Sequence, residues 1–94
     1  MKKIIRTQNA GVFYGKIESL DDATRVAVIR DARRVWRWDG AASLSQLAQE
    51  GTSKPDGCKF PCTVDRIKVY EVIEVLDMTD KAIASLDAVP LWEA

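Results

Sequence analysis

The chain has 94 residues, 47% of them hydrophobic and 30% charged, and its 14 Lys/Arg balance its 14 Asp/Glu. A chain of this length accommodates one modest core, so we expect residues 1–94 to form a single domain. The sequence contains no apolar run of about 18 residues and no signal-peptide pattern, which predicts a soluble cytoplasmic protein without a membrane segment.

The sequence contains no histidine, so no side chain has an unperturbed pKa near neutrality. It also shows no paired-carboxylate motif, no nucleophile beside a base and no glycine-rich phosphate loop. Cys58 and Cys62 are spaced C-x3-C, and without histidine they cannot complete a usual four-ligand zinc site within one chain. We therefore expect a protein that is not an enzyme, with no metal or cofactor and with two free thiols.

Four β-type runs occupy the first 38 residues: Lys2–Thr7, Val12–Ile17, Thr24–Arg30 and Arg33–Trp38. Gly15, inside the second run, predicts a bulge or the close approach of another backbone. The third run is apolar on both sides, which is typical of a central strand. Short links between the runs favour a curled antiparallel meander.

The second half of the chain adds two short helices and further strand. The first helix is expected to follow Ser43, which forms a capping box with Gln46, and to end at Gly51. Strands are expected at Cys62–Val64 and Ile67–Leu76, and a second helix at about Thr79–Val89, capped by Asp77 or Thr79. The predicted fold class is therefore α+β, a small antiparallel sheet of about five to six strands with two short helices.

Positive charge is concentrated in one stretch of this neutral chain. Residues 25–37 contain five arginines and one acid. If residues 33–38 form a strand, Arg33, Val35 and Arg37 lie on one side and Arg34, Trp36 and Trp38 on the other. Guanidinium groups match phosphate geometry and indoles stack on bases, which favours a ligand-binding strand. The alternative is that these side chains only cover the outer face of a sheet through the arginine stems.

Lys59 and Phe60 form a second candidate pair in the loop before the later strands. They either face the same ligand, or Phe60 simply anchors its loop.

The charge is also polarised along the chain. Residues 1–37 carry nine Lys/Arg against four Asp/Glu, whereas residues 71–94 carry one against six. Two explanations remain open, namely pairing within the molecule and complementarity between subunits.

Four segments resemble a family of small phage and prophage proteins of unknown function. They are NAGVFYG near the start, ARRVWRWDGAASLSQLAQEG in the middle, VIEVL late in the chain and VPLW at the end. The sequence is also similar to the Thoeris anti-defence sponges. These phage proteins sequester the cyclic ADP-ribose isomer made by bacterial TIR-domain immune sensors and, in some members, cyclic oligonucleotides.

The resemblance implies a homo-oligomer, dimer or hexamer, in the host cytoplasm with ligand pockets between subunits. It implies arginines on phosphates and an aromatic ring against adenine. We expect these roles at Arg33, Arg34, Trp36 and Arg37, and at Lys59 and Phe60.

Three functions are therefore weighed. The first is a sponge that sequesters a small cyclic nucleotide. The second is a nucleic-acid-binding β-barrel, which zero net charge disfavours because polyanion binding depends on phosphate neutralisation. The third is a protein-interaction inhibitor that uses Trp36, Arg37 and Trp92 as interface anchors.

Overall fold

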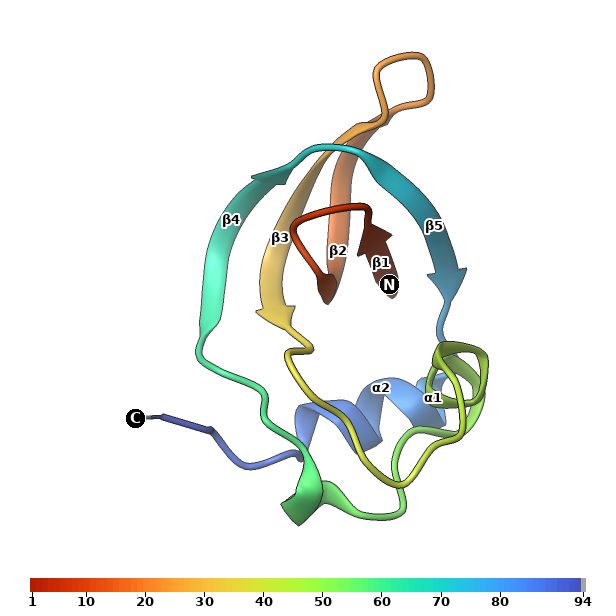
Figure 1. The fold of residues 1–94 in the computed structure, drawn as a ribbon, viewed down its shortest axis with the longest axis vertical. Coiled ribbons are helices and arrows are strands. Elements are labelled where there is room, and N and C mark those ends of the chain that lie inside the picture. The colour runs from red at the N-terminus through yellow and green to blue at the C-terminus, as the bar shows by residue number, and fades with distance from the viewer. Residues whose placement is uncertain (94) are drawn as a thin grey trace.

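The computed structural model describes residues 1–93 and consists of one antiparallel sheet and two α-helices (Figure 1). The strands pair in the order β4-β3-β2-β1-β5. In chain order the elements are β1 (Lys2–Thr7), β2 (Val12–Asp21), β3 (Val26–Arg34), α1 (Leu44–Glu50), the short 3₁₀ helix η1 (Pro55–Gly57), β4 (Thr63–Val69), β5 (Val72–Asp77) and α2 (Asp80–Asp87). The α+β class and the antiparallel sheet are confirmed.

The curl of the sheet follows from the link between β4 and β5. These two strands lie at opposite edges of the sheet, yet only Tyr70 and Glu71 connect them. Three Cα steps of about 3.8 Å let Val69 and Val72 lie at most about 11 Å apart. A flat five-stranded sheet separates its edge strands by four spacings, about 19 Å. The sheet therefore bends until its edges approach at one end, as the arch in Figure 1 shows, without β4 pairing with β5.

Several predicted strand boundaries are wrong, and β2 extends to Asp21 instead of ending at Ile17. Arg33–Trp38 is not a separate strand, because β3 runs on through Asp31 and ends at Arg34. Asp31 has a φ of 50° and lies where the β2–β3 register shifts, so it forms a bulge within one strand. The predicted strand Ile67–Leu76 breaks at Glu71, whose φ is 58°. Its first part and the predicted strand Cys62–Val64 belong to one continuous strand, β4.

Gly15 marks the bulge, as predicted. The register of β2 against β3 shifts between Tyr14 and Lys16. A Cβ at Gly15 would lie 2.7 Å from Ile29 Cγ2 and 2.8 Å from the carbonyl oxygen of Arg30. Only glycine allows the two strands to approach this closely.

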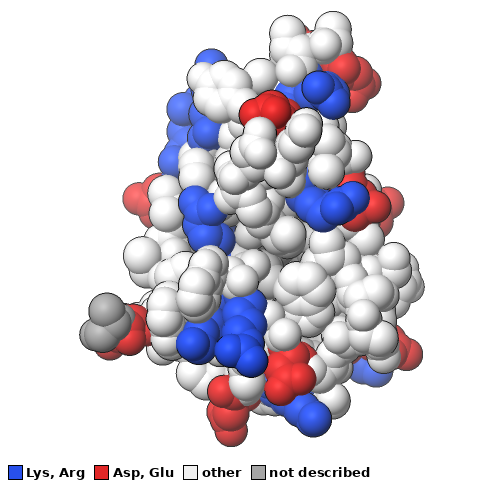
Figure 2. All heavy atoms as spheres, viewed as in Figure 1, with Lys and Arg blue, Asp and Glu red and all other residues white. Residues whose placement is uncertain are grey.

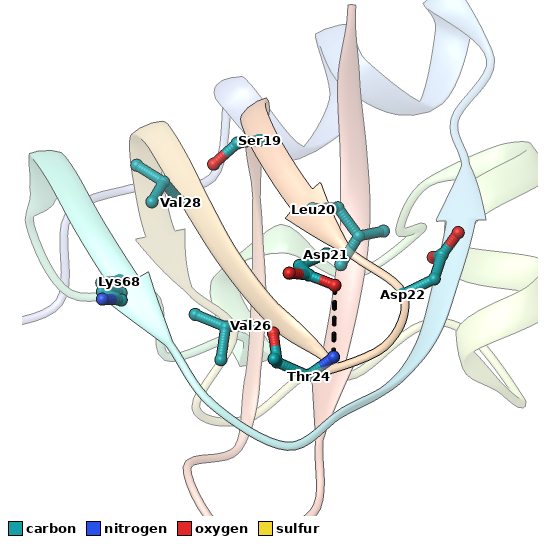
Figure 3. A pocket seen from close by; sticks show the side chains of 8 residues that line it. All are labelled: Ser19, Leu20, Asp21, Asp22, Thr24, Val26, Val28 and Lys68. Atoms are coloured by element: carbon teal, nitrogen blue, oxygen red, sulfur yellow. Dashed lines mark hydrogen bonds between the residues drawn. The ribbon is translucent and has the colours of Figure 1, made fainter.

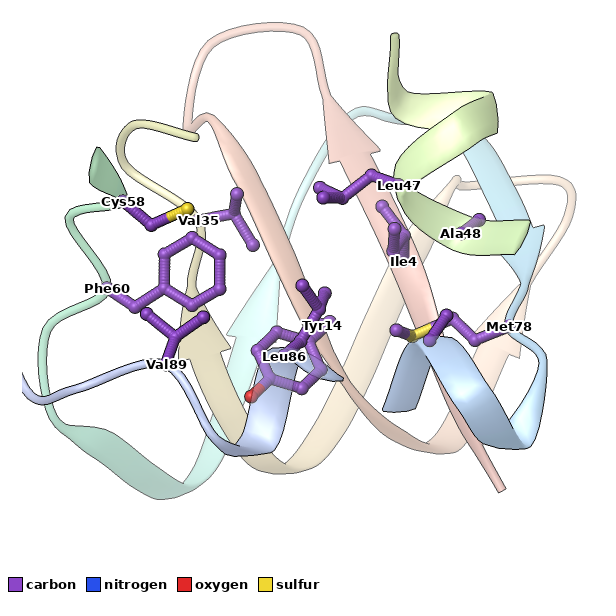
Figure 4. Packing of buried hydrophobic residues seen from close by; sticks show 11 residues of the cluster. Ile4, Tyr14, Val35, Leu47, Ala48, Cys58, Phe60, Met78, Leu86 and Val89 are labelled. Atoms are coloured by element: carbon purple, nitrogen blue, oxygen red, sulfur yellow. The ribbon is translucent and has the colours of Figure 1, made fainter. Parts of the chain in front are cut away.

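The curled sheet buries side chains on both of its faces. The concave face holds a small cluster with members from all five strands, including Ile5, Phe13, Ile29, Val69 and Val72. The opposite face packs against the helices in a larger cluster (Figure 4). Its members include Ile4, Tyr14, Leu47, Phe60 and Leu86. Because neighbouring strand residues point to opposite faces, Ile4 and Ile5 enter different clusters.

Both helices begin at their predicted caps. The Ser43 hydroxyl accepts the amide hydrogen of Gln46, but the Gln46 side chain accepts from Ala42 rather than from the Ser43 amide. The first helix is followed by Gly51 at a φ of 78°, as expected for a helix C-terminus. Thr79, rather than Asp77, caps α2 by accepting from Ala82.

Ion pairs within the molecule account for part of the uneven distribution of charge along the chain. Lys3 pairs with Asp77, and Arg6 with Glu74, across the β1–β5 ladder. The Lys2 ammonium lies 2.9 Å from the carboxylate of Asp87, the last residue of α2. These contacts join the basic N-terminal segment to the acidic C-terminal one.

Candidate functional site

Two of the six predicted site residues, Arg33 and Phe60, are buried. The Arg33 side chain is 8% exposed and lies on the face of the sheet that packs against α2. Its guanidinium donates to five backbone carbonyl oxygens, those of Phe60, Pro61, Leu86, Val89 and Pro90. Phe60 is fully buried beneath it, with its ring centroid 5.3 Å from the Arg33 Cζ. Both residues therefore position neighbouring segments.

Arg34 lies on the opposite, concave side of β3. It is paired with Phe13 in the β2–β3 ladder, and its guanidinium lies 4.4 Å from the centre of the Phe13 ring. One Nη donates to the carbonyl oxygen of Ala10 at 2.5 Å. A guanidinium has five N–H donors, so several remain for other partners.

Arg34 and Trp36 border the same hollow, which has a volume of about 340 Å³. Its wall is completed by Trp38, Val35, residues 9–11 of the β1–β2 turn and Val12 at the start of β2. We call this space the tryptophan hollow. Its size is within the range of about 300–1,000 Å³ that is typical of small-molecule sites.

Arg37 and Lys59 lie beside this hollow and do not line it. Their backbones exchange two hydrogen bonds, of 3.3 and 2.7 Å, in an isolated antiparallel bridge. The Lys59 ammonium lies 5.4 Å from the ring centres of both Trp36 and Trp92. These two indoles stack with centroids 5.0 Å apart and planes 9° apart.

Three of the candidate cations differ from Arg6, Arg30 and Arg66 in their partners. Arg6, Arg30 and Arg66 each pair with a glutamate. Within residues 1–93, Arg34, Arg37 and Lys59 have no carboxylate within ion-pair distance. Their positive charge is therefore available to an anion from solution.

Basic side chains do not form one continuous track on the face drawn in Figure 2. Lysines and arginines lie there in separate groups, with carboxylates beside several of them. The Glu18 carboxylate accepts from Arg30 at 2.6 Å and from Arg66 at 3.3 Å. The Arg30 hydrogen bond, more than the other contacts, lowers the pKa of Glu18.

A larger hollow, of about 780 Å³, is lined by none of the predicted site residues. It lies at the end of the β2–β3 hairpin, between Asp21, Asp22, Val26 and Lys68 (Figure 3). The Asp21 carboxylate accepts from the amides of Thr24 and Ala23, and these hydrogen bonds lower its pKa. Asp21 thus holds the turn together.

Sequence reasoning missed two kinds of contributor. Trp38 shares a predicted strand side with Arg34 and Trp36 but is not among the predicted site residues, and it lines the tryptophan hollow. The β1–β2 turn was read as a connection only, yet it forms the opposite wall. Its composition, Gln-Asn-Ala-Gly, indicates a turn and carries no indication that it folds back over Arg34.

Several other findings concern the described residues as a whole. Cys58 is buried, Cys62 is exposed, and both are free thiols. Residues 1–93 bring together no group of three or more Cys, Asp or Glu that could hold a metal ion. Neither helix in this part of the chain is long and apolar enough to cross a bilayer.

Comparison with known proteins identifies the family of the chain. No curated protein and no solved structure matches it. One family model does match, over residues 1–86. The chain therefore belongs to the family described as a domain of unknown function, DUF6948.

Proposed function

We propose that this protein is a non-catalytic binder that captures a small phosphate-bearing nucleotide in the tryptophan hollow. The observation that carries the proposal is that Arg34 and Trp36, two residues selected from the sequence for this role, border one hollow of about 340 Å³. Following the resemblance to the Thoeris sponges, the ligand class is a cyclic nucleotide immune signal. The protein would act for a phage against bacterial defence.

The tryptophan hollow offers hydrogen-bond donors to the phosphate of a nucleotide and aromatic surface to its base. A phosphate accepts hydrogen bonds from the free guanidinium donors of Arg34. A base stacks on an indole of Trp36 or Trp38, and such stacking contributes about 1–3 kcal/mol per base. Arg37 and Lys59 add positive potential at the rim, where an approaching anion passes.

The proposal includes a homo-oligomer. Trp36 is 58% exposed, so the tryptophan hollow lacks a cover in a single chain. A second copy related by symmetry can close it without enlarging the small core of each chain.

The first test has two parts. Protein purified from cells that produce the TIR-derived signal is heated, and the released nucleotides are identified by mass spectrometry. Ligand-free protein is then titrated calorimetrically with cyclic ADP-ribose isomers, cyclic dinucleotides, cyclic trinucleotides, linear ADP and a single-stranded oligonucleotide. We expect one cyclic nucleotide to bind with the highest affinity. Failure of every cyclic nucleotide to bind, with nothing released on heating, overturns the proposal.

Variants then locate the site. Arg34→Gln and Trp36→Ala should each weaken binding by about tenfold or more, because each removes an interaction of at least about 1.4 kcal/mol. Arg66→Gln, a matched control on the exposed side of β4, should leave the affinity within about twofold. Trp36→Phe should retain most of the affinity, since the stacking surface remains.

A second candidate is a protein-interaction module. Trp36, Leu91 and Trp92 are 58%, 55% and 38% exposed, and the two indoles stack on one another. Trp is enriched among residues that dominate protein interfaces. A single stoichiometric partner recovered from host lysate, and lost with Trp92→Ala, would favour this function over nucleotide capture.

A further inference from the structure

We propose a second ligand site, adjoining the tryptophan hollow at Arg34, for a small amphipathic acid with an aromatic or branched apolar body. The site consists of two adjoining hollows of about 210 and 250 Å³ that share Phe13, Arg34 and Ile67. We call the two together the concave groove, because its floor belongs to the concave face of the sheet. This inference does not rest on the nucleotide proposal.

The smaller hollow is apolar over most of its wall. Phe13 and Ala32 are buried members of the concave-face cluster, and Ile67 packs against that cluster. Val64, which is 43% exposed, forms the outer flank, next to Pro61 and Cys62. A protein cavity of about 150 Å³ is sufficient for benzene, so this hollow is large enough for one aromatic ring.

The charge around the groove selects an anion. Arg34 borders both hollows, and Lys68 borders the larger one. Neither has an ion-pair partner in the described chain. Glu71 also lines the larger hollow, where the Asn9 side chain donates to its two carboxylate oxygens at 3.1 and 3.2 Å, and its negative charge leaves the groove with a net charge of +1 from Arg34, Lys68 and Glu71. An acid group on the ligand therefore meets two unpaired cations beside an apolar floor.

The concave groove and the tryptophan hollow can be tested separately. Arg34 borders both sites and lies between them, with Phe13 on the groove side and Trp36 on the other. Val64 and Ile67 line only the groove, whereas Trp36 and Trp38 line only the tryptophan hollow. If variants show that one of the two sites binds no ligand, the other site can still be tested with its own lining residues.

The probe is 1-anilinonaphthalene-8-sulfonate, an aromatic body with one acid group. We expect its fluorescence to report one bound probe per chain, with affinity weakened by about tenfold in Val64→Glu and in Arg34→Gln. Val75→Glu is the matched control, since Val75 is a 36% exposed valine on β5 outside the groove. Both Val75→Glu and Trp36→Ala should bind the probe within about twofold of the parent protein. Circular dichroism checks that each variant is folded.

The thiols give an independent readout. Cys62 borders the smaller hollow and is exposed, whereas Cys58 is buried in the other core. Saturating probe should slow iodoacetamide alkylation of Cys62 several-fold and leave the already slow alkylation of Cys58 unchanged. An unprotected Cys62, equal weakening in Val64→Glu and Val75→Glu, loss of binding in Trp36→Ala, or no probe binding each overturns the concave-groove proposal.

Discussion

The guanidinium of Arg33 donates a 3.0 Å hydrogen bond to the carbonyl oxygen of Val89, just beyond the end of α2. A second bond, of 3.3 Å, reaches the Leu86 carbonyl within the last turn of that helix. Carbonyl oxygens at a helix C-terminus lack intrahelical partners and carry partial negative charge, which a cation neutralises. Arg33 thereby holds α2 and the loop around Phe60 against the sheet.

Arg33→Met is expected to destabilise the protein by about 1–3 kcal/mol, because the buried Val89 carbonyl oxygen loses its donor, whereas those of Phe60 and Leu86 keep the backbone amides of Trp92 and Val89. Arg33→Lys should recover only part of this loss, since an ammonium cannot reach five acceptors in the planar arrangement. The measurement is urea unfolding followed by circular dichroism. Arg37→Ala, at an exposed arginine four residues later, is the control and should change the unfolding free energy by less than about 0.5 kcal/mol. A small effect of Arg33→Met would show that Arg33 is not structural.

Gly15→Ala is expected to cost about 1–3 kcal/mol of unfolding free energy. The new methyl group would lie 2.7 Å from Ile29 Cγ2 and 2.8 Å from the Arg30 carbonyl oxygen, so β2 and β3 must separate locally. Ser19→Ala, on the exposed end of the same strand, is the control. Thermal unfolding at matched concentration compares the two, and equal stability of both variants would contradict the close approach.

Local features of the fold could be predicted from the sequence. The caps Ser43 and Thr79 each involve an amide three positions away, and Gly15 by its residue type alone indicates the bulge; all three are confirmed. The alternation of side chains along a strand predicted wrong strand boundaries where a non-glycine residue adopts a positive φ. Asp31 continues a strand through such a position, whereas Glu71 ends one, and nothing in the residue type distinguishes these outcomes.

The site could be predicted only in part, because its geometry depends on contacts between segments that are distant in the sequence. Arg33 and Arg34 are chemically identical neighbours, and strand alternation correctly sends them to opposite faces. Which face meets α2 depends on segments 53 to 57 residues away in the chain, whose carbonyl oxygens Arg33 reaches. Periodicity within one strand contains no such information.

Tyr14 should make stability depend on pH in the alkaline range. Burial raises the pKa of Tyr14 from its usual 10.0 to about 12. The unfolded chain then releases the phenolic proton more readily than the folded protein. The stabilisation from this residue is therefore complete below pH 10 and is lost as the pH rises toward 12. By pH 11 the loss is on the order of 1 kcal/mol.

Tyr14→Phe tests this assignment. The variant loses the hydrogen bond that the Tyr14 hydroxyl donates to Asp87 at 3.0 Å, so it should be less stable at neutral pH. Between pH 9 and pH 11, however, it should lose less stability than the parent protein. Tyr70→Phe, at an exposed tyrosine, should show the parent pH dependence. An identical decline in the parent and in Tyr14→Phe would exclude Tyr14 as the source.

The stacking of Trp36 on Trp92 should appear as an energetic coupling between them. Trp92 is also held by its amide, which donates to the Phe60 carbonyl oxygen at 3.0 Å, so this residue is fixed against Trp36 at the tryptophan hollow. In a double-mutant cycle of Trp36→Ala and Trp92→Ala, we expect a coupling of about 0.5–1.5 kcal/mol in unfolding free energy. The control cycle pairs Trp36→Ala with Tyr70→Phe, which lie in separate parts of the fold and should be additive. Additivity in the tryptophan cycle itself would mean that the stack contributes nothing to stability, and Trp92 would then be a surface residue available to a partner protein.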